Sequence, residues 1–280
     1  MTHVQPSQVA GMGYHYIYYP LDYLFDTQAA AGYTTIELVA QAPHYFVGEK
    51  GYQDPAQVRG KAEAHGLTIG ALVPEDTNYP FRINLADDTD RQRSLEYYKQ
   101  VFEAAEGFGT HVVPVCPWGA TKDEDPQAAF ERLCATVAAL APCAQDHGVV
   151  MAVTNLSPSQ GTVCTTLDEM DRLLAAVDHP AAAANLDLGA MGIAGETPEQ
   201  WFDLLGKKIV HMYFADGRPC GHMVWGEGLF PLERYLEVAN RYGYEGLLGQ
   251  KITDGAYFDD PAAADKRNLS AFEPYFAKEA

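Results

Sequence analysis

The 280-residue sequence lacks several features that mark particular protein classes. It has no run of 18 apolar residues, so no membrane-spanning helix is expected. The first residues show neither the charged nor the hydrophobic segment of a signal peptide, and the five cysteines are scattered without a CxxC pair. These absences favour a cytoplasmic protein with free thiols over a secreted protein held by disulfides.

Basic residues are also scarce. The chain has 19 Lys and Arg against 38 Asp and Glu, which gives a formal net charge of -19. Nucleic acids and anionic membranes bind basic surfaces, so we expect neither as a partner. The hydrophobic content of 47% is sufficient for a buried core and excludes general disorder.

What the sequence does contain is a regular alternation of short apolar runs and helix-patterned stretches, with no linker that divides the chain. Eight such units of about 35 residues predict a single (β/α)8 TIM barrel, an α/β fold, over residues 1–280. The polar far ends of several runs would then share one rim, where the active sites of such barrels lie. The expected strands are Val9–Ile17, Thr35–Val39, Thr68–Val73, His111–Cys116, Val149–Thr154, Ala182–Asp187, Ile209–Phe214 and Gly246–Ile252.

Segments along nearly the whole chain resemble the xylose-isomerase-like barrel family of sugar isomerases and epimerases. The resemblance implies a small-molecule carbohydrate as substrate, a ketose or sugar derivative bound in a pocket at the C-terminal rim. The segments that carry the resemblance are GYTTIEL (32–38), PHYF (43–46), VPEDTNYPFRINL (73–85), LDLGAM (186–191), VHMYFADG (210–217), GHMVWGEG (221–228) and YEGLL (244–248).

The resemblance also implies a divalent metal (Mn, Mg or Zn) held by two glutamates, an aspartate and a histidine at the ends of strands five to eight. The two glutamates of the family also move the proton next to the sugar carbonyl. The matching positions here are Thr154, Asp187, His211 and Gln250. A metal held by Asp187, His211 and Gln250 should bind weakly because two carboxylates are missing. Neither Thr nor Gln can replace a glutamate as a base near neutral pH.

Other residues would then supply the acid/base chemistry. Glu37, Glu75 and His211 are the candidate catalytic groups, because each is expected at or near the rim. Lys251 is expected to point away from the barrel axis, because neighbouring side chains of a strand alternate between its faces. Two further carboxylates flank the loop after strand seven, Asp216 and Glu227.

Six residues are candidates for substrate contact: His44, Trp118, Thr154, Gln160, Arg218 and His222. His222 matches a family histidine, Gln160 replaces a family glutamate, and Arg218 could bind a carboxylate or phosphate. The aromatic residues of the rim loops could stack on a sugar ring, or could pack within loops or a subunit interface. They are Tyr45, Phe46, Tyr79, Phe81, Trp118 and Trp225.

The sequence leaves three functions open. The first is a carbohydrate isomerase or epimerase. The second is a changed chemistry in the same barrel, such as a lyase or C-glycoside cleavage. The third is a non-catalytic sugar-binding subunit of a hetero-oligomer. The resemblance itself favours a homo-oligomer, and the fold alone does not decide among these activities.

Overall fold

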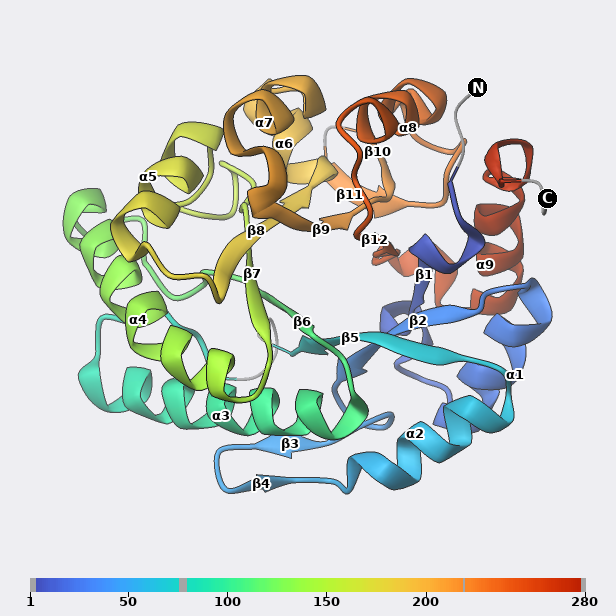
Figure 1. Cartoon of the computed structure of the whole chain (residues 1–280), viewed down its shortest axis with the longest axis horizontal. Coiled ribbons are helices and arrows are strands. Elements are labelled where there is room, and N and C mark those ends of the chain that lie inside the picture. Colours follow the sequence, from blue (N-terminus) through green and yellow to red (C-terminus); the bar gives the residue numbers. More distant parts are fainter. Residues whose placement is uncertain (1–3, 76–79, 219, 278–280) are drawn as a thin grey trace.

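The computed structural model describes residues 4–75, 80–218 and 220–277. Eight parallel strands form one sheet in the order β5-β2-β1-β12-β9-β8-β7-β6, and the outermost two, β5 and β6, lie side by side (Figure 1). The predicted (β/α)8 barrel is therefore confirmed. The strands are β1 (Val9–Met12), β2 (Thr35–Ala40), β5 (Thr68–Pro74), β6 (Val112–Val115), β7 (Val150–Thr154), β8 (Ala182–Asp187), β9 (Ile209–Tyr213) and β12 (Leu247–Gln250).

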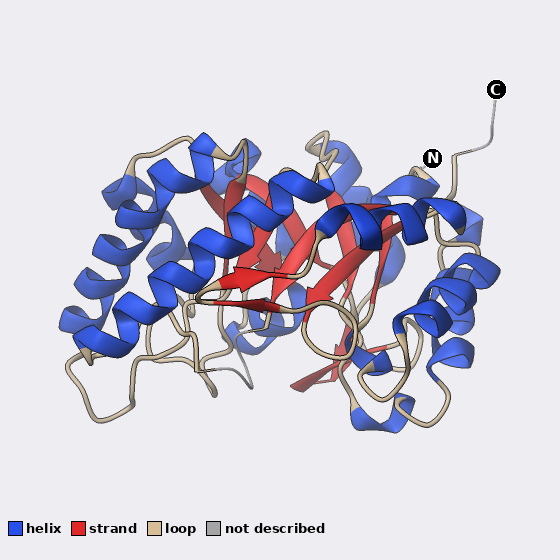
Figure 2. Cartoon of the chain, turned by 90° about the horizontal axis from the view of Figure 1, so that it is seen from below, coloured by secondary structure: helices blue, strands red, loops and turns tan. Residues whose placement is uncertain are grey.

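Helices surround this ring of strands, and a second view shows them outside the sheet (Figure 2). Many begin at a side chain that accepts a backbone hydrogen bond, as Asp54, Asp87, Asp125 and Thr166 do. The helices are α1 (Leu21–Ala31), α2 (Pro55–Ala64), α3 (Asp88–Phe108), α4 (Pro126–Asp146), α5 (Leu167–Val177), α6 (Leu188–Ala194), α7 (Pro198–Leu205), α8 (Leu232–Arg241) and α9 (Pro261–Ser270).

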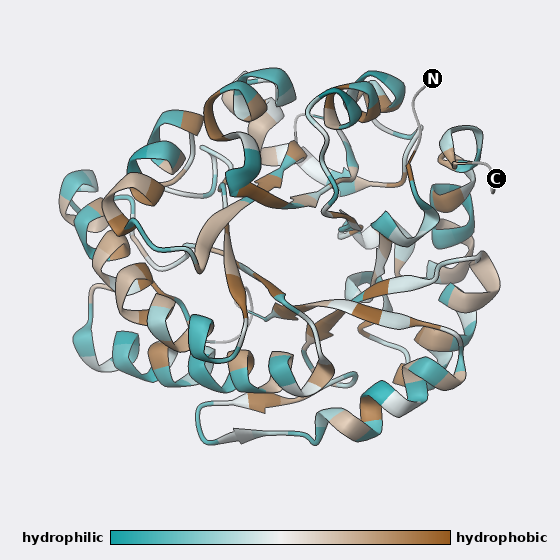
Figure 3. Ribbon diagram, in the orientation of Figure 1, coloured by the Kyte–Doolittle hydropathy of each residue, from teal (hydrophilic) through white to brown (hydrophobic). Residues whose placement is uncertain are grey.

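The hydrophobic residues follow the strands and the helix faces that cover them (Figure 3). In α3, Leu95, Tyr98, Val101, Phe102 and Ala105 are buried at the three- and four-residue spacing of a helix that packs along one face. Among the described helices, none combines the length and hydrophobicity that a bilayer-spanning segment needs.

The structure departs from the expected elements in two places. The first strand ends at Met12 rather than Ile17, because residues 14–16 form a short 3-10 helix that turns His15 and Tyr16 toward α9. There His15 Nε2 lies 3.0 Å and the Tyr16 hydroxyl 2.8 Å from the buried carboxylate of Asp265. Two short hairpins also appear outside the barrel, β3 (Val47–Gly48) with β4 (Gly51–Tyr52), and β10 (Asp216–Arg218) with β11 (Cys220–Met223).

The pairing of β12 decides which of its side chains face the barrel axis. Gln250 pairs with Gly11 of β1, and a Cβ on Gly11 would lie 2.7 Å from the side chain of Gln28 in α1. Gly11 and Gln250 therefore face the helices. A Cβ on Gly249 would lie 2.1 Å from Glu37 Oε1, so Gly249 faces the axis. Side chains alternate along a strand, so Leu247 and Gly249 take the inner face of β12, and one further residue follows directly after its end.

That residue is Lys251, and two expectations need correction. Gln250 does not point toward the axis. Its Oε1 accepts a hydrogen bond of 2.7 Å from Asn268 Nδ2 in α9, and its Nε2 donates to the Leu248 carbonyl. Lys251 does not point away from the axis, because it lines the cavities at the mouth of the barrel.

The substitution Gly249→Ala tests whether Gly249 faces the barrel axis. The added methyl group would collide with the buried Glu37 carboxylate, so we expect the free energy of unfolding to fall by about 1–3 kcal/mol. Urea denaturation measures the change. The control is Gly60→Ala in α2, where the added Cβ meets nothing within 4 Å and should stabilise the protein by about 0.5–1 kcal/mol. A similar effect at both positions would contradict the assigned facing of β12.

Candidate functional site

Two adjoining cavities open at the C-terminal ends of the barrel strands. The larger, which we call the rim cavity, has a volume of about 150 Å³, and the smaller, the axial cavity, about 70 Å³. Cys116, Trp118 and Lys251 line both, so the cavities meet at these side chains. A cavity of about 150 Å³ has room for one six-membered ring.

Asp187 is the most constrained polar residue of the rim cavity. It ends β8 and caps α6, where its Oδ1 accepts the Ala190 amide at 3.1 Å. His222 Nε2, from β11, lies 3.0 and 2.8 Å from the two carboxylate oxygens, and Lys251 Nζ lies 3.5 Å from Oδ2. The side chain of Asn155 bonds both the backbone amide and the carbonyl of Asp187. The carboxylate is thus fixed by its own backbone and by two potential cations.

These contacts set the protonation of the site. Burial alone would raise the pKa of the Asp187 carboxyl, but the charges of His222 and Lys251 and the hydrogen bonds from His222 and Ala190 hold it well below its usual range. Asp187 is therefore ionised near neutral pH, and His222 Nε2 donates to it. The other ring nitrogen, Nδ1, lies 3.3 Å from the Thr253 hydroxyl.

A second polar network lies beneath the cavities. His211 Nε2 is 2.7 Å from Glu37 Oε1, and His211 Nδ1 is 2.9 Å from Asn185 Oδ1. The Asn185 amide donates to the Thr154 hydroxyl at 2.8 Å. Glu37 and His211 are fully buried and line neither cavity. Among these four described residues, Thr154 is the one that lines the rim cavity.

The structure brings some of the expected site residues together and separates others. The rim cavity is lined by Trp118, Thr154, Gln160, Asp187 and His222, all of which were expected at the site. Glu75 lines the axial cavity beside Tyr14 and Tyr213. His44, Arg218 and Gln250 line neither.

Several of the residues outside the cavities have structural contacts. His44 is buried, with its Nε2 3.1 Å from the Tyr19 carbonyl, whereas Arg218 is exposed. Asp216 accepts hydrogen bonds from the amides of the following loop, including Gly226 and Gly228. Glu227 bonds Tyr257 and Arg267, so neither loop carboxylate reaches the cavities.

The donor set at the four family positions does not fit a divalent cation. Gln250 faces α9, both ring nitrogens of His211 are engaged, and Thr154 accepts a hydrogen bond from Asn185. Within residues 4–75, 80–218 and 220–277, no three His, Cys, Asp or Glu side chains form a group that could hold a metal ion. The ammonium of Lys251 beside Asp187 would also repel a cation.

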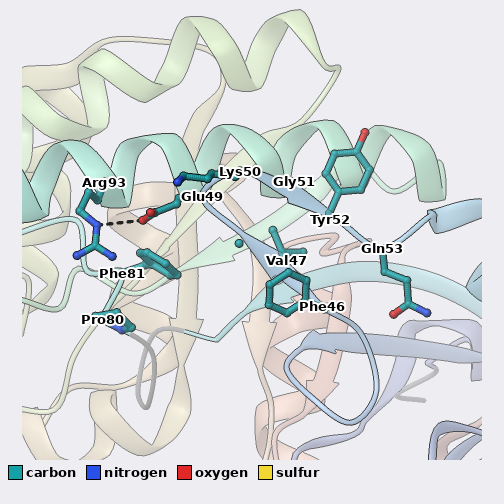
Figure 4. A pocket seen from close by; sticks show the side chains of 11 residues that line it. Phe46, Val47, Glu49, Lys50, Gly51, Tyr52, Gln53, Pro80, Phe81 and Arg93 are labelled. Carbon is teal, nitrogen blue, oxygen red and sulfur yellow. Dashed lines mark hydrogen bonds and ion pairs between the residues drawn. The ribbon is translucent and has the colours of Figure 1, made fainter.

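A larger hollow lies elsewhere, outside the barrel. It is an open groove of about 890 Å³ between the β3–β4 hairpin and α3, crossed at one end by an ion pair between Arg93 and Glu49 (Figure 4). The ionisable side chains among its described lining residues are Glu49, Lys50, Tyr52 and Arg93.

The rim-loop aromatic residues are dispersed among three environments. Trp118 lines both cavities, while Phe46 and Phe81 line the outer groove. Tyr45 and Trp225 are buried, and the Trp225 indole donates to the Phe214 carbonyl. Tyr79 lies outside the described residues. Of the described residues of this set, Trp118 is therefore the one placed to meet a ligand at the mouth.

Sequence reasoning missed Lys251 and several small polar residues of the rim cavity. Asn155, Ser157 and Ser159 line it directly after β7, and Thr253 lines it after β12. Their position just beyond the ends of strands was a usable signal, because the catalytic face of a barrel is built from such loops. The orientation of Lys251 required the register of β12.

Comparison with known proteins agrees with this architecture. Residues 25–270 match the family model of the xylose isomerase-like TIM barrel. The chain belongs to this family. The expected resemblance to sugar isomerases and epimerases is confirmed.

Individual relatives are distant in sequence. Fructoselysine 3-epimerase of Escherichia coli O157:H7 is 24% identical over 255 residues, which cover 90% of this chain and 92% of that protein. The structure of 3-keto-D-glucoside 4-epimerase from E. coli superimposes with a TM-score of 0.80 at 16% identity, covering 95% of this chain and 99% of that one. A D-psicose 3-epimerase structure gives 0.78 at 15% identity, covering 96% and 100%.

The buried His44 predicts a pH dependence of stability. Burial lowers the pKa of His44 below its ordinary value, although a hydrogen bond to the Tyr19 carbonyl opposes the shift. The unfolded chain then binds a proton more readily, so the stability that neutral His44 confers at pH 7 is lost as the pH falls through about 6.5. We expect His44→Gln, which keeps a donor for Tyr19, to weaken the decline in unfolding free energy between pH 7 and pH 5.

Urea denaturation across this pH range measures the slope. His111→Gln, at an exposed histidine, is the matched control. An unchanged slope in His44→Gln would contradict a neutral buried imidazole.

Proposed function

We propose that the rim cavity binds a ketose or keto-sugar derivative and transfers the proton on the carbon next to its carbonyl group, as a sugar isomerase or epimerase. The observation that carries the proposal is the His222–Asp187 pair within a small polar cavity at the barrel mouth. Membership of the xylose isomerase-like family supports the same class of substrate.

The lining of the rim cavity suits a polyol. Hydroxyl and amide groups can each donate or accept a hydrogen bond, which matches the alternating hydroxyl groups of a sugar. Trp118 adds an aromatic surface against which the apolar face of a sugar ring can pack. The groups concerned are those of Thr154, Asn155, Ser157, Ser159, Gln160 and Thr253.

The proton transfer follows from the orientation of His222. Asp187 accepts the hydrogen of Nε2, so Nδ1 carries the lone pair when the ring is neutral. Nδ1 contacts the Thr253 hydroxyl at 3.3 Å, and the substrate must take the place of this contact before Nδ1 accepts the proton from the substrate carbon. The electron pair of the C–H bond then forms a carbon–carbon double bond, the carbonyl π pair moves to the oxygen, and Asp187 stabilises the resulting imidazolium. Return of the proton to the former carbonyl carbon, together with transfer of the adjacent hydroxyl proton to the former carbonyl oxygen, isomerises the sugar.

Epimerisation needs a second group, because the proton must return to the opposite face of the same carbon. Glu75 fits this role, since it lines the axial cavity while His222 lines the rim cavity. Lys251 lies where the two cavities meet. Glu37 and His211 do not touch either cavity, so we assign them a positioning role exerted through Asn185 on Thr154.

We expect the protein to perform this function as a homo-oligomer in the cytoplasm. Light scattering of the purified protein measures the association. A monomer at all concentrations would contradict it.

Exchange of carbon-bound hydrogen with deuterated water tests the function without knowledge of the product. Among D-fructose, D-psicose, D-tagatose, fructoselysine and a 3-keto-glucoside, we expect at least one to gain deuterium next to its carbonyl, detected by mass spectrometry. His222→Gln should slow this exchange by about 10²–10⁴-fold through loss of the base. Glu75→Gln should slow epimerisation more than exchange.

The exposed substitution His111→Gln should leave the exchange rate unchanged. If sugars of the panel bind but none of them exchanges hydrogen for deuterium, the proposal is wrong. It would instead favour the non-catalytic sugar-binding subunit, or a lyase or C-glycoside cleavage that begins elsewhere on the substrate.

A further inference from the structure

Lys251 lies at the mouth of the barrel, in the region where the resemblance to the family implies a divalent metal. Lys251 Nζ lies 3.5 Å from Asp187 Oδ2 and 4.1 Å from the centroid of the Tyr213 ring. A carboxylate and an aromatic face both stabilise an ammonium ion. With 21% of its side chain exposed, Lys251 is held in place yet accessible from both cavities.

The facing of Lys251 is built into the fold. Gln250, the preceding residue, is fully buried and bonded to Asn268 of α9. Asn268 Oδ1 in turn accepts the Trp225 amide. These contacts hold Gln250 on the outer face at the end of β12, and Lys251, the next residue, lines both cavities.

A metal-like role for this ammonium follows from the chemistry of the proposed reaction. When the α-proton leaves, negative charge develops on the carbonyl oxygen, and a fixed positive charge beside that oxygen lowers the barrier. The donor set at the mouth does not suit a divalent ion, whereas the ammonium already lies beside the Asp187–His222 pair.

We propose that the Lys251 ammonium takes the place of the divalent cation, so that the site polarises its substrate without a bound metal. This inference rests on the proposed function. In the reaction, an N–H of Lys251 donates to the carbonyl oxygen, and His222 or Glu75 removes the α-proton. The C–H electron pair forms the carbon–carbon double bond of the enolate, and the carbonyl π pair moves to the oxygen, which stays hydrogen-bonded to the ammonium. Reprotonation at carbon restores the carbonyl, and Lys251 forms no covalent bond.

Manganese binding, followed by electron paramagnetic resonance, tests the claim independently of activity. We expect the wild-type protein to bind no stoichiometric Mn²⁺ at millimolar concentration. The double variant Thr154→Glu/Lys251→Glu should gain a bound Mn²⁺, because it places two carboxylates beside Asp187. Its matched control is Thr154→Glu/Gln250→Glu, whose second carboxylate faces α9 and should not produce the same gain.

Two measurements test the lysine itself. In EDTA-treated buffer, oxalate, which resembles an enediolate, should bind the wild type and bind Lys251→Met at least about tenfold more weakly. Where a sugar of the panel exchanges deuterium, Lys251→Met should reduce the rate by about 10²–10³-fold, and Lys251→Arg should retain part of it. Lys61→Met, at an exposed lysine paired with Asp22, should change neither. Thermal melting verifies that each variant folds.

The outcomes separate this inference from the proposed function. Stoichiometric Mn²⁺ in the wild type that Asp187→Asn abolishes, or exchange that EDTA eliminates, overturns the role of Lys251 while the function stands. Trapping of a sugar on Lys251 by borohydride also overturns it, since it would show a covalent imine. Failure of every sugar to exchange overturns the function, while the manganese and oxalate results still decide whether the ammonium replaces a metal.

Discussion

The hydrogen bond between Asn268 and Gln250 is the contact on which the mouth of the barrel depends. It joins α9 to the last strand and holds the Gln250 amide on the helix side of the sheet. Lys251, the residue directly after Gln250, lies on the other side and lines the cavities at the mouth. A one-residue slip of this strand would reverse both and would replace the ammonium with a neutral amide.

The fold was predictable because the alternation of apolar runs and helical segments follows directly from the (β/α) repeat. The inward positions of Thr154, Asp187 and His211 were predictable too, since each lies at or near the end of a clear strand. The facing of β12 was not, because the outward residues Leu248 and Gln250 and the inward residue Gly249 are all buried. A strand covered on both sides carries no hydropathy signal for its face.

The interior of the barrel holds two polar layers with different partners. The lower layer joins Glu37, His211, Asn185 and Thr154, and the upper layer joins Asp187, His222 and Lys251. Gly249 leaves the space that the Glu37 carboxylate fills. Glu37 and His211 are 174 residues apart, so their contact could not be inferred from either segment alone. It also explains why this histidine is not available at the cavity.

The position of Asp187 at the start of α6 has a consequence for how a ligand is received. The Asp187 carboxylate is anchored by the amide of Ala190, and the side chain of Asn155 holds the Asp187 backbone. The carboxylate therefore needs no rearrangement when a ligand binds. Ordering a mobile side chain on binding commonly costs about 0.5–1.5 kcal/mol, and that cost is here met during folding. The affinity for a ligand can therefore depend on how well the ligand fits the cavity, because the Asp187 side chain is already ordered.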